Sequence, residues 1–361
     1  MKRVLTLVLT IILVIGCLSL AHAEEMPRYK YGILYYSLTD TLGTEVVHWA
    51  EKFGEMFGCE VQCLQVEGTD ANITGVENLC AAGCDVILSC FVDAGLPRVL
   101  QICEEYGVYF GAINREVPSE EIQATIEAMP AYKWWVGGVK ENEYQAGYNV
   151  VKSLIDLGCQ KFALIGRAPG SSSSHDDRYA GFLDALKDAG LEPVAEARGN
   201  NDEQAEFINN MLTMDIDAMA ITGGGMDKAI QPISAAGLTG KVKLGTIDVG
   251  GGAIEALENK YIDCVLGCHS IDVLFSMMNA YNYLGGCPLR DEPSNFTLNY
   301  WVVDSVEVYE MYLEKCVGDV FPFTIDELKS VMKPFNSEAT YEDMQALIDT
   351  WTPECISAKV A

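Results

Sequence analysis

One unit recurs along this chain and limits what it can fold into: a short apolar strand, a small polar loop and an amphipathic helix. Lys161–Arg167 is an apolar run, and Ala168–Asp177 is a polar loop that contains four serines. From Arg178 onward, apolar side chains recur at helical spacing until Gly190. This order is typical of α/β proteins, which place ligands at the carboxyl ends of their strands.

The same alternation runs through most of the sequence in two consecutive series. Alternating strands and helices predict parallel sheets with right-handed crossovers, and 361 residues suit about two domains. We therefore predict an α/β fold of two doubly wound, Rossmann-like lobes. The expected strands are Tyr31–Tyr36, Glu60–Val66, Asp85–Val92, Val108–Arg115, Phe162–Gly166, Pro193–Arg198, Ala218–Thr222, Val242–Ile247, Asp263–Gly267 and a last long strand, Phe296–Val303.

The two series also predict where the lobes begin and end. The first lobe is expected to comprise residues 28–136 with 270–297, and the second lobe residues 140–268 with 298–319. Three crossing segments would then form a hinge. Residues 320–361 lie outside the repeat and form a C-terminal extension without a predicted position.

Residues 1–23 have the features of a secretory signal peptide. Two basic residues precede the apolar run Val4–Leu20, and Ala21-His22-Ala23 is a small-x-small cleavage site. Val14–Cys17 also has the form of a lipobox, which would attach a lipid to Cys17 instead. Both alternatives predict an exported protein, in the periplasm or at the cell surface. A permanent membrane anchor is the third alternative, and no later run is long enough to span a bilayer.

Charge and cysteine content narrow the possible partners. The formal net charge is −28, and it becomes more negative when the signal is removed, so a nucleic-acid partner is not expected. Several of the twelve cysteines after Ala23 lie in apolar runs, where a thiol behaves as a small hydrophobe. No CxxC motif occurs, and three histidines follow the signal, so we expect no metal site. The protein is expected to be a monomer.

Two motifs suggest enzymes but lack essential parts. Gly223–Gly225 follows a predicted strand, yet no third glycine completes GxGxxG. Ser171–Ser174, His175 and Asp176 include the residue types of a catalytic triad, but adjacent residues do not converge as a triad must, and no GxSxG occurs. We therefore expect neither catalysis nor a cofactor.

Short polar side chains instead follow the predicted strands. If two doubly wound lobes face each other, these strand ends meet at one cleft. Carboxylates and amides can each bind a pair of hydroxyls, and arginine donates several hydrogen bonds from one plane. The predicted ligand-binding residues are Ser37, Thr39, Asp40, Ser89, Asn114, Arg115, Asp176, Asn201, Thr222 and Asp248.

A set of motifs in a fixed order carries a family resemblance over about residues 30–305. The motifs are Tyr31–Asp40, Asn114-Arg115, Ala146-Gly147, Phe162–Gly166, Arg178–Phe182 with Ala185-Leu186, and Thr246–Asp248. In this order the chain resembles the type I periplasmic binding proteins of the ribose/galactose-binding family. The resemblance implies an extracytoplasmic receptor of an ABC importer, with a membrane permease as partner, that closes on a monosaccharide or similar polyol.

The resemblance also implies roles for individual residues. Asn114, Arg115 and Asp248 would contact ligand hydroxyls, whereas Arg178 matches a family arginine that is at least partly structural. Asp176 stands where many members have a ligand-binding arginine.

Two further departures concern the ligand. Leu42-Gly43 replaces an aromatic pair of the family, and Gly225-Met226 replaces its Asn-Asp. Trp134 and Trp135 could offer another stacking surface or could pack in the core. Carboxylates at Asp40, Asp176 and Asp248 leave open a receptor for an amine or amino-sugar. A sugar sensor that acts on a signalling partner is a further alternative.

Overall fold

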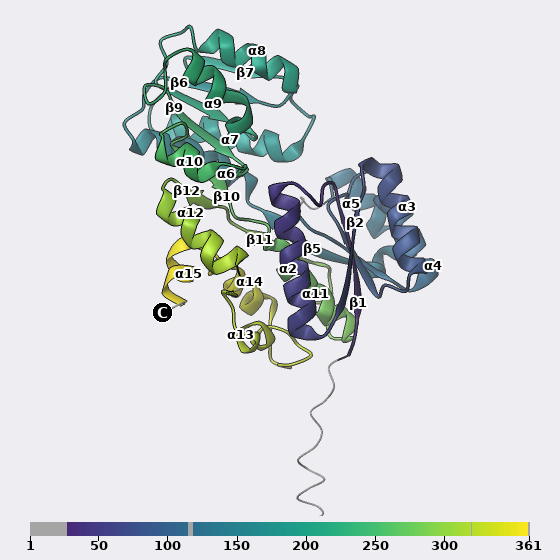
Figure 1. Cartoon of the computed structure of the whole chain (residues 1–361). Coiled ribbons are helices and arrows are strands. Elements are labelled where there is room, and N and C mark those ends of the chain that lie inside the picture. The colour runs from purple at the N-terminus through teal and green to yellow at the C-terminus, as the bar shows by residue number, and fades with distance from the viewer. Residues whose placement is uncertain (1–26, 115–117, 319, 360–361) are drawn as a thin grey trace, which may run out of the picture.

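The computed structural model describes residues 27–114, 118–318 and 320–359. The predicted signal peptide, Cys17 and Arg115 therefore lie outside the described residues. The described chain forms two lobes, each built on a six-stranded sheet (Figure 1). This confirms the prediction of two α/β lobes with mostly parallel sheets.

The sheet of the first lobe is entirely parallel, with strand order β11-β5-β4-β3-β1-β2. Its central strands are buried along their whole length, as in a sheet that helices cover on both sides. The strands are β1 (Lys30–Tyr35), β2 (Glu60–Gln65), β3 (Val86–Ser89), β4 (Tyr109–Ala112), β5 (Trp135–Glu141) and β11 (Ser294–Leu298). The helices are α2 (Thr41–Phe57), α3 (Gly68–Ala81), α4 (Leu96–Tyr106), α5 (Glu120–Glu127), the 3₁₀ turn η1 (Pro130–Trp134) and α11 (Asp272–Leu284).

The sheet of the second lobe has the order β12-β10-β9-β8-β6-β7, and β12 alone runs antiparallel to its neighbour. Its strands are β6 (Phe162–Gly166), β7 (Ala195–Arg198), β8 (Ala218–Ile221), β9 (Lys243–Ile247), β10 (Cys264–Gly267) and β12 (Trp301–Val303). The helices are α6 (Glu143–Asp156), α7 (Ser173–Asp188), α8 (Asn201–Met211), α9 (Gly225–Ala235) and α10 (Ala253–Glu258).

The chain passes between the two sheets three times: after β5, after β10 and between β11 and β12. The long last strand predicted at Phe296–Val303 is wrong, because β11 and β12 are short strands of different sheets. Apolar residues continue across the turn between β11 and β12, so the sequence pattern does not indicate that the chain moves from one sheet to the other. The strands also extend the first lobe to Glu141 and Leu298, beyond the expected limits at 136 and 297.

The C-terminal extension packs on the first lobe and reaches the second. After α12 (Val306–Tyr312) and the π-turn η2 (Leu313–Val317), it forms α13 (Ile325–Ser330), α14 (Tyr341–Asp349) and α15 (Pro353–Lys359). Trp351 is 2% exposed and lies between Trp49 of α2 and Trp301 of β12, at ring-centroid distances of 5.8 and 5.0 Å. The side-chain amide of Gln345 both donates to and accepts from the backbone of Thr297 in β11.

The interior explains several residues whose roles the sequence left open. Trp135 is 1% exposed and packs near Phe110, so it belongs to the core. Cys103 and Cys264 are buried among apolar side chains, as expected for small hydrophobic residues. None of the helices in the described parts of the chain could cross a membrane.

Candidate ligand-binding site

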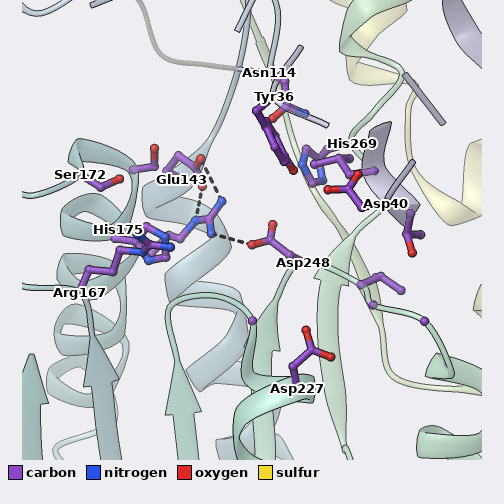
Figure 2. A pocket seen from close by; sticks show the side chains of 18 of the residues that line it. Tyr36, Asp40, Asn114, Glu143, Arg167, Ser172, His175, Asp227, Asp248 and His269 are labelled. Carbon is purple, nitrogen blue, oxygen red and sulfur yellow. Dashed lines mark hydrogen bonds and ion pairs between the residues drawn. The ribbon is translucent and has the colours of Figure 1, made fainter. Parts of the chain in front are cut away.

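A cavity of about 650 Å³ lies where the carboxyl ends of both sheets face each other (Figure 2). In Figure 2, Tyr36, Asp40 and Asn114 of the first lobe lie opposite Arg167 and His175 of the second. The volume is within the range of small-molecule sites, about 300–1,000 Å³. The lining residues are Tyr36, Asp40, Thr41, Leu42, Asn114, Glu143, Arg167, Ser171, Ser172, Ser174, His175, Arg178, Gly224, Asp227, Asp248, Val249, Gly250, Gly251 and His269.

The first lobe contributes groups that local structure fixes. Asp40 is the N-cap of α2, and its Oδ1 accepts from the Gly43 amide at 2.7 Å, which leaves Oδ2 available at the cavity. Tyr36 follows β1 and presents an aromatic ring; burial raises its pKa to about 12, so its hydroxyl is protonated at neutral pH. Asn114 follows β4, its backbone amide donates to Asp272, and its Nδ2 is buried with no partner among the described residues.

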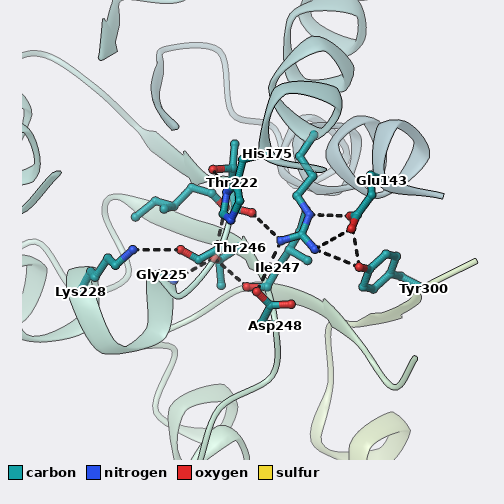
Figure 3. Close-up of polar contacts among 12 residues, drawn as sticks. Glu143, His175, Thr222, Gly225, Lys228, Thr246, Ile247, Asp248 and Tyr300 are labelled. Atoms are coloured by element: carbon teal, nitrogen blue, oxygen red, sulfur yellow. Dashed lines mark hydrogen bonds and ion pairs between the residues drawn. The ribbon is translucent and has the colours of Figure 1, made fainter. Parts of the chain in front are cut away.

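The second lobe is organised around Arg178, which is 6% exposed. Figure 3 labels its partners Glu143, Thr222, Asp248 and Tyr300. Its Nε and Nη2 donate to the two carboxylate oxygens of Glu143 at 2.5 and 3.1 Å. Nη2 also donates to the hydroxyl of Tyr300 at 2.9 Å, and Nη1 donates to the Thr222 carbonyl at 2.9 Å. These bonds occupy most of the five donors of the guanidinium, so Arg178 mainly holds other groups in place.

Asp248 receives the remaining interaction of Arg178 and faces the cavity. Its Oδ2 lies 3.4 Å from Nη1 of Arg178, and its side chain is 43% exposed. Burial opposes ionisation of Asp248, but the positive charge of Arg178 and its hydrogen bond favour the carboxylate, and the pKa of Asp248 is lowered. Asp248 is therefore an ionised acceptor with room for ligand hydroxyls.

Two neutral histidines face the cavity. Burial, together with Arg178 and Arg167, lowers the pKa of His175 to about 3, and its Nδ1 hydrogen bonds with Thr222 Oγ1 at 2.7 Å. Burial lowers the pKa of His269 to about 4, its ring lies 4.4 Å from that of Tyr300, and its Nδ1 has no partner in the structure's described part. A neutral imidazole can donate or accept, which suits hydroxyl ligands.

Unusual backbone conformations gather at this edge of the sheets. Asn114, Asp248 and Cys268 lie one or two residues after β4, β9 and β10 and have φ values of 47°, 72° and 58°. Each costs about 1–3 kcal/mol for a residue other than glycine, and such residues concentrate at functional sites. A steric limit explains one of the three glycines Gly223–Gly225: a Cβ at Gly223 would lie 2.9 Å from His175 and 3.1 Å from Asp248.

The structure brings three of the predicted site residues to the cavity: Asp40, Asn114 and Asp248. Thr222 lies behind it, where it holds His175 and Arg178. The remaining predicted residues in the described chain do not line the cavity, and Arg115 lies outside the described residues. Those that do not line it are Ser37, Thr39, Ser89, Asp176 and Asn201.

Local hydrogen bonding explains these departures. The hydroxyl of Ser37 accepts from the amides of Thr39 and Asp40, and so supports the turn before α2. Ser89 is fully buried and donates to Asn72. Asn201 is the first residue of α8 and is exposed.

Asp176 requires a separate correction. Its Oδ2 accepts from the Gly170 amide at 2.9 Å, and its Oδ1 pairs with Arg198 of β7. The expectation that Asp176 faces the ligand does not fit this geometry, because α7 turns it toward β7. The cavity receives its accessible guanidinium from Arg167 instead, whose side chain makes no hydrogen bond or ion pair with the described residues.

Several lining residues were not predicted as ligand contacts. They include Tyr36, Glu143, Arg167, Asp227 and His269. Tyr36, Arg167 and His269 lie within two residues after a strand, the position that led to Asp248. The prediction rested on short polar side chains after strands, and that pattern does not mark the larger side chains of Tyr36, Arg167 and His269.

The fold and the cleft define a two-lobed binding protein whose ligand site lies between its lobes. A periplasmic binding protein domain matches residues 31–284, and the chain belongs to this family. No curated protein sequence matches the chain. The family binds solutes rather than transforming them, and it is extracytoplasmic.

Solved structures share the fold at low sequence identity. An ABC transporter solute-binding protein from Actinobacillus succinogenes 130z with bound D-allose is 21% identical, with a TM-score of 0.66 over 78% of this chain and 98% of its own. One from Bacillus halodurans C-125 with bound myo-inositol is 17% identical, with a TM-score of 0.59 over 80% and 99%. A periplasmic ribose ABC transporter protein from Conexibacter woesei DSM 14684 is 14% identical, with a TM-score of 0.66 over 81% and 97%.

Proposed function

We propose that this protein is the extracytoplasmic receptor of an ABC importer and binds a neutral monosaccharide or a similar polyol between its lobes. The observation that supports this proposal is the cavity, into which both lobes direct hydrogen-bonding groups around the ring of Tyr36. A hinge motion about the three crossings would bring the two walls onto the ligand.

The chemistry of the lining favours many hydroxyls. Asp40 and Asp248 are acceptors, Arg167 and the Asn114 amide are donors, and the neutral His269 can be either. The ring of Tyr36 offers an apolar face for the C–H side of a sugar. The bound D-allose and myo-inositol of the two relatives are ligands of this kind.

The setting of the protein follows from the same proposal. Residues 1–23 would direct export, either as a cleaved signal or by lipid attachment at Cys17, and the loaded receptor would dock on a membrane permease. The receptor would act as a monomer. Mass spectrometry of the exported protein tests the first point, since an N-terminus at Glu24 and a lipidated N-terminus at Cys17 differ by a large mass.

A calorimetric and thermal-shift screen tests the ligand class. The panel contains D-allose, D-ribose, D-galactose and myo-inositol, with glucosamine and putrescine as amines. We expect saturable binding and a raised Tm with at least one neutral compound, as mass action requires. Binding of the amines alone would replace the proposal.

An amine or amino-sugar is the second candidate, and one observation favours it. The lining holds four carboxylates, those of Asp40, Glu143, Asp227 and Asp248, against two guanidiniums, and both of its histidines are neutral. The positive charge of Arg178 compensates the charge of Glu143 and part of the charge of Asp248. The carboxylates of Asp40 and Asp227 are then left to attract a cation. Glucosamine binding that weakens strongly in an Asp227→Asn variant would support this candidate.

A further inference from the structure

The loop between β6 and α7 forms one wall of the cavity without regular secondary structure of its own. It supplies Arg167, Ser171 and Ser172 to the lining. Within the loop, the amide and hydroxyl of Ser171 both donate to the Ala168 carbonyl. These bonds shape a tight turn but do not fix where the turn lies relative to the cavity.

Two side chains outside the cavity hold this loop from behind. Asp176, in the first turn of α7, accepts from the Gly170 amide at 2.9 Å. Arg198, at the end of β7, donates from Nε to the Arg167 carbonyl at 2.9 Å. Asp176 and Arg198 also bind each other, so one ion pair holds the loop at its first residue and at its middle.

The ion pair is itself held firmly. The guanidinium of Arg198 lies over the ring of Tyr179, 4.7 Å from its centroid, and the Tyr179 hydroxyl donates to Glu196 at 2.8 Å. The side chains of Arg198 and Asp176 are 21% and 33% exposed. An arginine fixed by stacking and two hydrogen bonds has a defined position, which an isolated surface pair lacks.

We propose that Asp176 and Arg198 are positioning residues of the ligand site: their ion pair sets the loop so that Arg167 and the serine hydroxyls face the bound solute. No described side chain holds the guanidinium of Arg167, and Arg198 binds only its backbone carbonyl. The loop backbone therefore determines where the guanidinium lies. The ion pair would thus control affinity without touching the ligand. The effect on affinity rests on the proposed function, whereas the effect on the loop does not.

Hydrogen exchange of the ligand-free protein tests the loop directly. In Asp176→Ala, we expect at least tenfold faster exchange in peptides covering residues 167–175, because the Gly170 amide loses its acceptor. Asp176→Asn keeps an oxygen for that amide and loses only the charge, so its effect should be smaller. Asp177→Ala is the matched control, since Asp177 is exposed on the same helix turn and its side chain makes no hydrogen bond with the described residues. Unchanged exchange in Asp176→Ala overturns the proposal.

A double-mutant cycle measured with D-allose then tests whether the ion pair acts through Arg167. Asp176→Ala should weaken binding about tenfold in the wild-type background and less than twofold in the Arg167→Ala background. Equal losses in both backgrounds would show that Asp176 does not act through Arg167 and would overturn the proposal. If the wild-type protein binds none of the screened solutes, the proposed function fails, and the exchange experiment alone decides on the positioning role.

Discussion

The two lobes share a fold but use different means to stay ordered. The first lobe contributes Asp40 as its one charged residue in the described cavity lining, and aromatic side chains around Trp351 of the C-terminal extension pack α2 of this lobe against β12 of the second. At the cavity, the second lobe is ordered in a different way. It relies on a buried polar network centred on Arg178, whose members also form the ligand site.

In the first lobe, the contacts that stabilise the fold are distinct from the groups that face the ligand. In the second lobe, the same groups do both. Apolar contacts that brace the first lobe lie away from its ligand-facing groups, so we expect them to tolerate change without loss of specificity. In the second lobe, the same hydrogen bonds stabilise the fold and position Asp248 and His175. The following predictions test that contrast.

Trp351→Ala should have the largest effect on stability. The side chain is almost fully buried, and its indole donates to the Cys268 carbonyl at 2.7 Å. Removing a buried tryptophan costs about 3–5 kcal/mol. Urea unfolding followed by fluorescence measures the loss, and the folded variant should keep its ligand preference. A changed preference would show that the extension shapes the site.

Arg178→Met should impair both stability and binding. Removing one partner of a buried ion pair costs about 3–5 kcal/mol, because Glu143 is then left buried without its partner. Asp248 also loses its neighbour, so affinity should fall at least a hundredfold in calorimetry. Arg98→Met is the matched control, since its ion pair with Glu77 is about half exposed on both sides and should contribute at most about 1 kcal/mol.

Asp248→Asn should weaken binding with little change in folding. The amide keeps the size of the carboxylate but replaces an ionised acceptor with a weaker one, which is worth about 1–3 kcal/mol at a hydrogen bond to charge. We expect a tenfold to hundredfold rise in Kd, with a fall in Tm smaller than that of Arg178→Met because the ion pair with Asp248 is partly exposed. A rise in affinity for the neutral sugars would contradict the assigned role.

His269→Gln should flatten the pH dependence of stability on the acid side. The pKa of His269 is about 4 in the folded protein, below its usual value of about 6.5, so as pH falls below 6.5 the unfolded chain takes up the proton first. The folded state therefore loses stability between pH 6.5 and 4, on the order of 3 kcal/mol in total. Burial raises the pKa of Glu141 and of Asp272, which acts in the opposite direction, so the comparison must be between wild type and variant. Parallel curves for the two proteins would refute the assignment.

Gln345→Ala should have the smallest effect. It removes two hydrogen bonds to Thr297 that are partly exposed, which together amount to about 1–2 kcal/mol. A drop in Tm of a few degrees, with unchanged ligand affinity, is the expected result. Any loss of affinity would show that the extension is coupled to the cleft.

The sequence predicted the fold more completely than the site. Apolar strands such as Phe162–Gly166 and helix ends such as Gly190 are local signals, and the structure places β6 and α7 where they indicate. Asp40, Asn114 and Asp248 reached the cavity because position after a strand determines which edge of the sheet a residue occupies. Position after a strand does not determine where a side chain points. Asp176 turns toward Arg198 at the end of the next strand, β7, and no local pattern in the sequence indicates this partner.

The extension could not be placed for a related reason. Its contacts join residues far apart in sequence, as when Trp351 packs against Trp49. Its short helices carry no repeat that would indicate their partner. Likewise, the pattern at Phe296–Val303 resembles one strand although its two halves lie in different sheets.

The pairing of Gln345 with β11 bears on how copies of this protein behave toward one another. β11 is the outermost strand of its sheet, and such a strand can recruit a strand of another molecule through its free backbone groups. Here the outward groups of Thr297 bind the Gln345 amide, and the Asn295 carbonyl accepts from the Tyr341 hydroxyl. The C-terminal segment thus ends the growth of the sheet, and it shields this edge from pairing with the edge of another molecule.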